Sequence, residues 1–288
     1  FVHPHSYAVL QDTLDYLQRL GINAIQLMPV QEFEGNEGWG YNPSYHMALD
    51  KDYGSADALR ALVEECHSRG MAVILDVVYN HAFGQSPLAL LYWDGAQNRP
   101  AANNPWLNPI PKHDFNVGND FNHESPATKY FVKRVISWWM QTYGIDGFRF
   151  DLASGFTQRN SLGNFNEWAR YDTSRINNIQ EYADLMWSID PESYVILENF
   201  VDNSERKELS SRGMMLWGNM SIEYGQASKG FGGSDLGGSW WEHVGWGEPG
   251  LIAYMESHDE ERLMYKNLTA GNSGPGYNIK ELKVALGR

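Results

Sequence analysis

Three features are scarce in this 288-residue sequence, and each scarcity excludes a class of protein. A single cysteine, Cys66, rules out an internal disulfide framework. The 22 Lys and Arg residues fall short of the 36 Asp and Glu residues, so the net charge of −14 argues against nucleic acid or an anionic membrane as partner. No apolar run approaches the roughly 18 residues of a membrane span. We therefore expect a globular protein that acts on a neutral substrate.

The sequence alternates between apolar runs and helical patterns. Six short apolar runs predict buried strands, and the amphipathic segments between them predict helices. Near-continuous apolar strands that alternate with helices are typical of a parallel sheet covered by helices, so the predicted fold class is α/β. The strands are expected within 22–30, 71–78, 145–150, 194–197, 214–217 and 251–255.

Capping residues mark several of the expected helix ends. Ser55 and Ser125 are the expected N-caps of two helices, and Gly144 is expected to end the second of these. Cys66 falls on the apolar face of the first, which predicts a buried thiol. The expected helical ranges are 6–20, 55–69, 126–143, 176–187 and 203–211.

Three loop regions interrupt this alternation. Gly-rich loops are expected at 39–43 and 225–250, and a longer polar stretch at 82–125 has no sustained period of either kind. A loop as long as the last one is usually functional or a small subdomain. We expect it to be an insertion within a single domain that spans 1–288.

The stretch GFRFD at 147–151 places a carboxylate at the end of a predicted strand. Arg149 and Asp151 are two residues apart, so their side chains point to the same face of that strand. A guanidinium beside a carboxylate stabilises its charged form, which predicts that Asp151 is ionised at neutral pH and usable as a nucleophile or charge stabiliser. The alternative is a structural ion pair at a strand end.

Other predicted strands also end in polar side chains. The chemistry of a (β/α)8 barrel lies at the C-terminal ends of its strands. We therefore expect Asp151, Glu198 and Asp259 to converge in one cleft. The polar residues found at these ends are Asp76, Asn80, His81, Asp151, Glu198, His258 and Asp259.

At these strand ends the sequence resembles the α-amylase family, glycoside hydrolase family 13. Four segments in the same order carry the resemblance, with three supporting stretches, GINAIQLMP at 21–29, GWGYNP at 38–43 and GNDFN at 118–122. The resemblance implies a (β/α)8 TIM barrel whose first and eighth strands are absent from this chain and whose long loop after the third barrel strand is similar to the family's B domain. The four segments are DVVYNH at 76–81, GFRFD at 147–151, LENF at 197–200 and His258 with Asp259.

The resemblance implies a retaining cleavage of an α-glucosidic bond. Asp151 would be the nucleophile, Glu198 the general acid/base and Asp259 the transition-state stabiliser. Retention requires two carboxyl groups about 5 Å apart, one ionised and one protonated. The apolar run before Glu198 fits the protonated partner, because an apolar surrounding raises the pKa of a carboxyl group.

The same matching assigns five residues to substrate binding or to ordering the site. His81 and His258 would hydrogen-bond sugar hydroxyls, and Asp76 would help to fix Arg149, which would orient the nucleophile. Tyr41 would stack on a sugar face, because an aromatic plane suits the apolar face of a pyranose. The alternative for this tyrosine is an ordinary half-buried side chain.

The sequence departs from the family after the nucleophile. Many α-amylases carry Lys-His there, where the pair contacts the next sugar and helps to bind calcium, but here Ala153 to Phe156 reads ASGF. The chemistry requires no cofactor. Calcium stays open, with Asn80 and Asp120 as candidate oxygen ligands.

Several functions remain open at this point. The first is hydrolysis of α-1,4-linked glucans such as starch, glycogen and maltooligosaccharides. The alternatives are an α-glucan transferase, a branching or debranching enzyme, a catalytically silent glucan-binding homologue, and an enzyme for another neutral sugar. The sequence begins without methionine and ends inside a helical pattern at 286–288, so we expect a fragment, and a secreted, periplasmic or cell-surface location is favoured over the cytoplasm.

Overall fold

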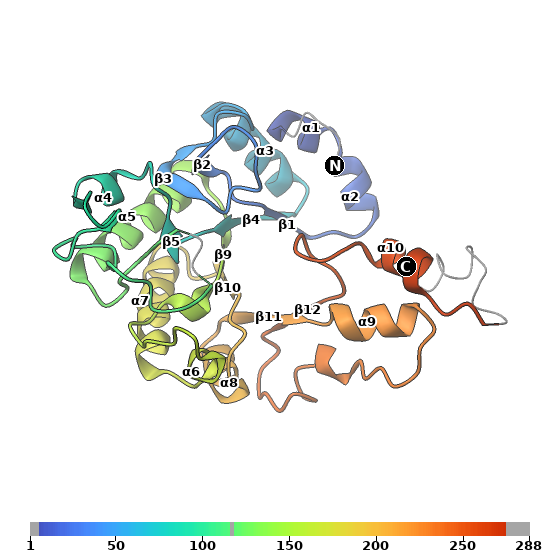
Figure 1. The fold of residues 1–288 in the computed structure, drawn as a ribbon. Coiled ribbons are helices and arrows are strands. Elements are labelled where there is room, and N and C mark those ends of the chain that lie inside the picture. Colours follow the sequence, from blue (N-terminus) through green and yellow to red (C-terminus); the bar gives the residue numbers. More distant parts are fainter. Residues whose placement is uncertain (1–5, 116–117, 275–288) are drawn as a thin grey trace. The chain divides into compact units, whose positions relative to one another are not determined.

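A computed structural model describes residues 6–115 and 118–274 of the chain, and Figure 1 shows its ribbon. The helical pattern expected at 286–288 lies outside the described residues. The chain divides into two compact units, Phe1–Glu205 and Arg206–Arg288, which are described in turn.

The first unit contains a parallel sheet of four strands in the order β1, β4, β9, β10. The neighbouring strands are in register, with Ile74 opposite Gly147 and Gly147 opposite Tyr194. A Cβ atom at position 147 would lie 2.2 Å from the main-chain oxygen of Tyr194, so this close approach requires glycine. All four strands were predicted. Their bounds are β1 (Ala24–Leu27), β4 (Ala72–Val77), β9 (Gly147–Phe150) and β10 (Tyr194–Leu197).

Long helices flank this sheet (Figure 1). Ser55 Oγ accepts a hydrogen bond from the main-chain N–H of Ala58, and Gly144 ends its helix in a left-handed conformation, as predicted. The thiol of Cys66 is buried, also as predicted. The helices are α3 (Ala56–Ser68), which packs against β4, α5 (Pro126–Tyr143) and α7 (Thr173–Ile189), which packs against α5.

One expectation about the first 50 residues was wrong, and one pair of strands there was missed. The single helix expected at 6–20 is broken into α1 (Tyr7–Gln11) and α2 (Leu14–Arg19). The break follows from Thr13, whose hydroxyl donates to Leu10 O at 2.7 Å and so competes with the helical backbone. The Gly-rich loop is confirmed, because residues 34–42 form the connection between β2 (Gln31–Phe33) and β3 (Pro43–Leu49). These two strands form an antiparallel ribbon that was not predicted, since their side chains do not alternate cleanly between buried and exposed.

The 82–125 stretch consists of short strands and a short helix packed around a small apolar core of its own. The strands β5 (His81–Ala82) and β8 (Asn119–Asp120) pair, as do β6 (Trp93–Asp94) and β7 (Arg99–Pro100). Four buried side chains and their neighbours form an apolar cluster, which explains how a polar stretch without periodicity stays compact. The remaining helix is α4 (Pro87–Leu90), and the four core residues are Ala82, Ala89, Leu107 and Phe121.

Shorter helical elements complete the first unit. They are η1 (Ala153–Gly155), directly after the GFRFD strand, and α6 (Phe165–Ala169). The predicted helix α8 (Asn203–Ser211) carries the boundary between the units.

The second unit contains two parallel strands, β11 (Met215–Asn219) and β12 (Leu251–Tyr254), both of which were predicted. The loop expected at 225–250 is partly helical, because α9 (Ser221–Ser228) reaches into it and η2 (Gly237–Ser239) lies within it. The helix α10 (Leu263–Ala270) follows β12.

The described residues therefore contain six strands of the parallel type, four in the first unit and two in the second, with helices between them. This is the α/β pattern of a (β/α)8 barrel, whose closed form has eight strands. None of the described helices has the length and apolar character needed to cross a bilayer.

Candidate active site

The candidate site lies at the C-terminal ends of β4, β9 and β10. Asp76 on β4 is in register with Arg149 on β9. The strand ladder continues past the last paired residues, because the main-chain N–H of Asp151 donates to Val77 O and that of Glu198 donates to Phe150 O. These local hydrogen bonds bring the polar ends of three adjacent strands together.

The guanidinium of Arg149 joins the carboxylates at these ends. Its Nη1 lies 2.8 Å from Asp76 Oδ1 and 2.8 Å from Asp151 Oδ1, and its Nη2 lies 3.2 Å from Glu198 Oε2. The side chains of Arg149 and Asp76 are fully buried, with 0% exposure, while those of Asp151 and Glu198 retain a small exposed fraction. One buried cation is thus shared by three carboxyl groups.

This arrangement raises the pKa of two of the carboxyl groups. Burial raises the pKa of Asp151 to about 6, and the negative charge of Asp76 adds to the rise, while Arg149 opposes it. Burial likewise raises the pKa of Asp76 to about 6 against the opposing effect of Arg149. The arginine therefore limits the rise, and the prediction that Asp151 is ionised at neutral pH agrees with this pKa. Asp151 is largely ionised at pH 7 and gains a proton near pH 6.

Glu198 is bound to the segment that follows Asp151. Its Oε2 accepts a hydrogen bond from the main-chain N–H of Leu152 at 2.7 Å, and its main-chain oxygen accepts one from Ala153. Leu152 has φ 46° and ψ 42°, a left-handed conformation that is strained for leucine. Its amide therefore points at Glu198 at some conformational cost. No sequence signal identified this residue, because leucine carries no preference for positive φ.

Two residues assigned to sugar binding are engaged with protein groups. The hydroxyl of Tyr41 donates to Asp76 Oδ2 at 2.8 Å. The His81 ring is 1% exposed, with Nε2 at 2.8 Å from Tyr41 O and Nδ1 at 3.1 Å from the side-chain nitrogen of Asn80. Burial lowers the pKa of His81 to about 4, so the ring is neutral. Their contacts with a sugar stay predictions.

The two candidate calcium ligands, Asn80 and Asp120, lie close together, but an oxygen of each faces a ring nitrogen of His113. His113 Nε2 is 3.1 Å from Asn80 Oδ1 and 3.5 Å from Asp120 Oδ1. The second carboxylate oxygen of Asp120 accepts hydrogen bonds from Asn108 Nδ2 and the main chain of Lys112. Calcium takes six to eight oxygen ligands, and an imidazole N–H lies where the ion would have to bind. In the described part of the chain, moreover, no group of three or more His, Cys, Asp or Glu could hold a metal. These residues do not fit calcium.

His258 and Asp259 belong to the second unit, where they follow β12. His258 Nε2 lies 3.4 Å from Asp259 Oδ1, and the carboxylate side chain is 57% exposed. The ring of His258 lies 6.4 Å from that of Trp217. The convergence of Asp259 with Asp151 and Glu198 therefore stays a prediction.

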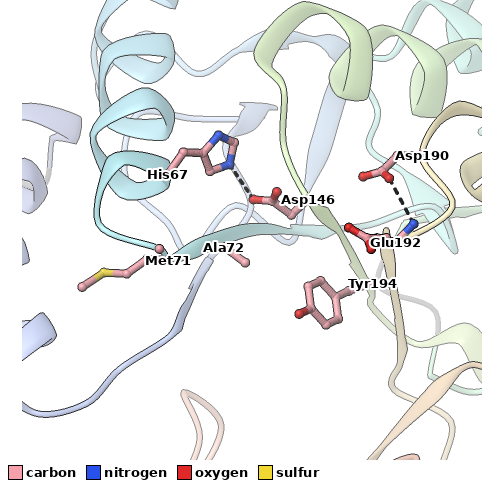
Figure 2. Close-up of a pocket in the computed structure, with 8 residues that line it drawn as sticks. His67, Met71, Ala72, Asp146, Asp190, Glu192 and Tyr194 are labelled. Atoms are coloured by element: carbon pink, nitrogen blue, oxygen red, sulfur yellow. Dashed lines mark hydrogen bonds and ion pairs between the residues drawn. The ribbon is translucent and has the colours of Figure 1, made fainter.

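A shallow pocket of about 320 Å³ lies at the opposite, N-terminal ends of the strands. Figure 2 shows His67 and Asp146 facing each other in it, beside Ala72 and Tyr194, which begin β4 and β10. Asp146 Oδ2 accepts hydrogen bonds from His67 Nε2 at 2.8 Å and from the main-chain N–H of Val73 at 2.6 Å. These contacts tie strand starts together, as expected at the face of a barrel that serves stability.

The chain is similar to several known proteins. A family model described as alpha amylase, catalytic domain, matches residues 8–88. The chain is 34% identical over 184 residues to isoamylase SU1, chloroplastic, of Zea mays, an alignment that covers 56% of this chain and 23% of that protein. It is 34% identical over 141 residues to malto-oligosyltrehalose trehalohydrolase of Saccharolobus solfataricus, covering 48% and 23%. The chain thus spans about a quarter of the length of the curated relatives it matches.

A solved α-amylase from Anoxybacillus is similar over most of the chain. The TM-score is 0.68 at 22% identity, and the match covers 92% of this chain and 57% of that one. Identity this low shows the fold alone, so the roles of individual residues depend on their motifs and geometry.

Proposed function

We propose that this chain carries the nucleophile and the general acid/base of a retaining α-glycoside hydrolase. The substrates are α-1,4-linked glucans such as starch, glycogen and maltooligosaccharides. The proposal starts from the matches above, which place the chain in the α-amylase family. The observation that carries the proposal is the bridging of Asp151 and Glu198 by one buried guanidinium at the C-terminal ends of adjacent strands. Retaining glycosidases need two such carboxyl groups, in different protonation states and on either side of the anomeric carbon.

The proposed reaction is a double displacement. A carboxylate oxygen of Asp151 attacks the anomeric carbon while Glu198 gives its proton to the departing glycosidic oxygen, and the C–O bond breaks. Glu198, now ionised, takes a proton from water, which attacks the glycosyl ester and frees Asp151. In this scheme Asp259 stabilises the positive charge that develops on the sugar.

The charge balance of the cluster supports this division of roles. Asp76, Asp151 and Glu198 face one guanidinium, so full ionisation would leave two surplus negative charges in a buried site. Such a cluster favours keeping one proton at neutral pH. Glu198 has the longest link to Arg149, at 3.2 Å against 2.8 Å for the other two, so we assign the proton to it.

A second candidate is a glucan transferase or a branching or debranching enzyme of the same family. It is favoured by the segment Ala153 to Phe156, which lacks the Lys-His pair that contacts the next sugar in many α-amylases. The names of the two relatives above, an isoamylase and a trehalohydrolase, also point to more than one reaction. A glucan-binding homologue without catalysis is disfavoured, because it would have no use for the strained amide that holds Glu198.

Product analysis separates these functions. The full-length protein is incubated with starch, with pullulan and with a short maltooligosaccharide, and the products are resolved by length and linkage. Hydrolysis yields shorter chains and new reducing ends, whereas a transferase yields longer or branched chains without a matching gain of reducing ends. Glu198→Gln should abolish either activity and leave glucan binding intact. Full activity in this variant would refute the proposed mechanism.

A further inference from the structure

A buried histidine joins the 82–125 stretch to the end of β4. The side chain of His113 is 1% exposed, and its Nε2 lies between two oxygens, Asn80 Oδ1 at 3.1 Å and Asp120 Oδ1 at 3.5 Å. The ring of Trp168 packs against it with centroids 4.6 Å apart, which holds the imidazole in place. Neither the sequence motifs nor the proposed reaction gives this histidine a role.

The hydrogen bonds that start at His113 have one consistent direction. Asn80 Oδ1 can only accept, so the nitrogen of His113 that faces it must carry the proton. The amide of Asn80 then directs its N–H at His81 Nδ1, which fixes the proton of that ring on Nε2 and lets it donate to Tyr41 O. The hydroxyl of Tyr41 in turn donates to Asp76, the carboxylate that pairs with the arginine of the site.

The backbone after the nucleophile closes over the first of these bonds. A Cβ atom on Gly155 would lie 1.9 Å from Asn80 Oδ1 and 2.8 Å from His113 Nε2. The position therefore tolerates no side chain. Gly155 and the ring of Trp168 thus pack against His113, in the place where a cation would need additional oxygen ligands.

We propose that His113 is a positioning residue, and that its imidazole N–H takes the structural place of a calcium ion by fixing the 82–125 stretch to β4. Its donor orients Asn80, and through that amide it sets the tautomer of His81 and the position of Tyr41 beside the catalytic cluster. The expected effect of His113 on catalysis rests on the proposed function. The proposal that His113 replaces calcium is independent of that function, because it concerns stability alone.

The first experiment tests the cation. Melting temperatures of the full-length protein and of Asp120→Asn are measured in EDTA and in millimolar calcium chloride, since a ligand that binds the folded state raises the melting temperature. We expect the same calcium response, whatever its size, in both proteins, because any calcium bound elsewhere is unaffected by residue 120. A calcium-induced rise in the wild type that Asp120→Asn removes would overturn the proposal.

The second experiment tests the donor, using His113→Leu and His113→Gln. Leucine fills most of the volume without an N–H, whereas glutamine can still donate to Asn80 Oδ1. We expect kcat to fall about tenfold in the leucine variant, with KM changed less than about threefold, and to recover to within about threefold in the glutamine variant. His67→Leu is the control, because His67 binds Asp146 at the opposite, N-terminal ends of the strands, and it should affect stability but not kcat. Equal kcat in both His113 variants would overturn the positioning role.

Glycine 155 gives an independent variant of the same contact. Gly155→Ala pushes a methyl group between Asn80 and His113, whereas the methyl group of Gly95→Ala, in the 82–125 stretch, meets open space. We expect the first to reproduce the loss of kcat and the second to be neutral; a neutral Gly155→Ala would contradict the proposal. If the wild-type protein cleaves no glucan, the proposed function fails, and the melting measurements still decide whether His113 or a cation holds this joint.

Discussion

Arg149 and Arg175 are both fully buried in the first unit, and they differ in the charge that surrounds them. Arg175 makes a two-point ion pair with Glu205, at 2.6 Å from Nε and 2.6 Å from Nη2, and its other N–H groups donate to main-chain oxygens, including that of Ser154. Arg149 is shared by three carboxyl groups, and the pKa of Asp151 is raised to about 6.

The comparison shows that charge balance, and not burial alone, separates a structural ion pair from a reactive one. Glu205 has each carboxylate oxygen engaged by donors, among them the main-chain N–H of Asp172 and the amide of Asn199. One carboxylate faces one guanidinium here, so the charges of this pair are balanced. The cluster around Arg149 carries surplus negative charge, so a proton can enter or leave it at moderate pH.

The largest expected difference between the two sites is in activity. Asp151→Asn keeps the shape of the nucleophile and removes its charge, so turnover of glucan should fall by about a thousandfold or more with the fold intact. Initial rates of the full-length variant, with circular dichroism as the check on folding, measure this. A variant that keeps more than about a tenth of the wild-type rate would show that another residue is the nucleophile.

The same kind of substitution at the other arginine should affect stability instead. Glu205→Gln places an amide nitrogen against the N–H donors of Arg175 and Asp172, and breaking a buried pair typically costs about 3–5 kcal/mol in the free energy of unfolding. Denaturant unfolding measures the loss. The control is Glu208→Gln, whose partner Arg212 lies on the surface, and it should change stability by less than about 1 kcal/mol. Equal losses in both variants would remove the distinction between the sites.

The sequence predicted those features of the fold and the site that depend on a local pattern of residues. The helix at 126–143 and the strand at 194–197 were predicted to the residue, because caps and short apolar runs are local signals. Asp151 and Glu198 were singled out as candidates because they follow such strands. The break in the first helix was missed, since a threonine within a helical period gives no reliable stop signal.

Features that depend on distant partners were out of reach. Arg149 and Asp76 are 73 residues apart, and their contact was expected only from the family resemblance; the rise that the charge of Asp76 causes in the pKa of Asp151 was not expected. The contact of His113 with Asn80 spans 33 residues and carries no motif. Such pairings arise only when the strands are stacked side by side, which no local window of the sequence encodes.

A smaller effect should appear in the pH dependence of stability. The pKa of Asp151 is about 6 in the folded protein and about 3.9 in an unfolded chain, so between these values the folded state binds more protons and stability falls as the pH rises. Ionised Asp151 thus destabilises the wild type by roughly 3 kcal/mol at pH 7. Asp151→Asn lacks this penalty, so it should melt higher than the wild type at pH 7, and the difference should shrink below about pH 4. A difference that does not vary with pH would show that Asp151 does not have the raised pKa.

The smallest expected effect concerns how Asp76 tunes its neighbour. The charge of Asp76 raises the pKa of Asp151, so Asp76→Asn should move the acidic limb of the kcat/KM profile to lower pH, by about 0.5–1 units. The substituted amide can still accept from Arg149 through its oxygen and bond the Tyr41 hydroxyl through its nitrogen, which separates the loss of charge from the loss of contacts. Tyr41→Phe serves as the control, because it removes the hydrogen bond to Asp76 without changing the charge, and it should shift the limb much less. If the limb moves to higher pH in Asp76→Asn, Asp76 acts mainly by holding Arg149 against Asp151. The surplus of negative charge would then not explain the difference between this site and the ion pair of Arg175.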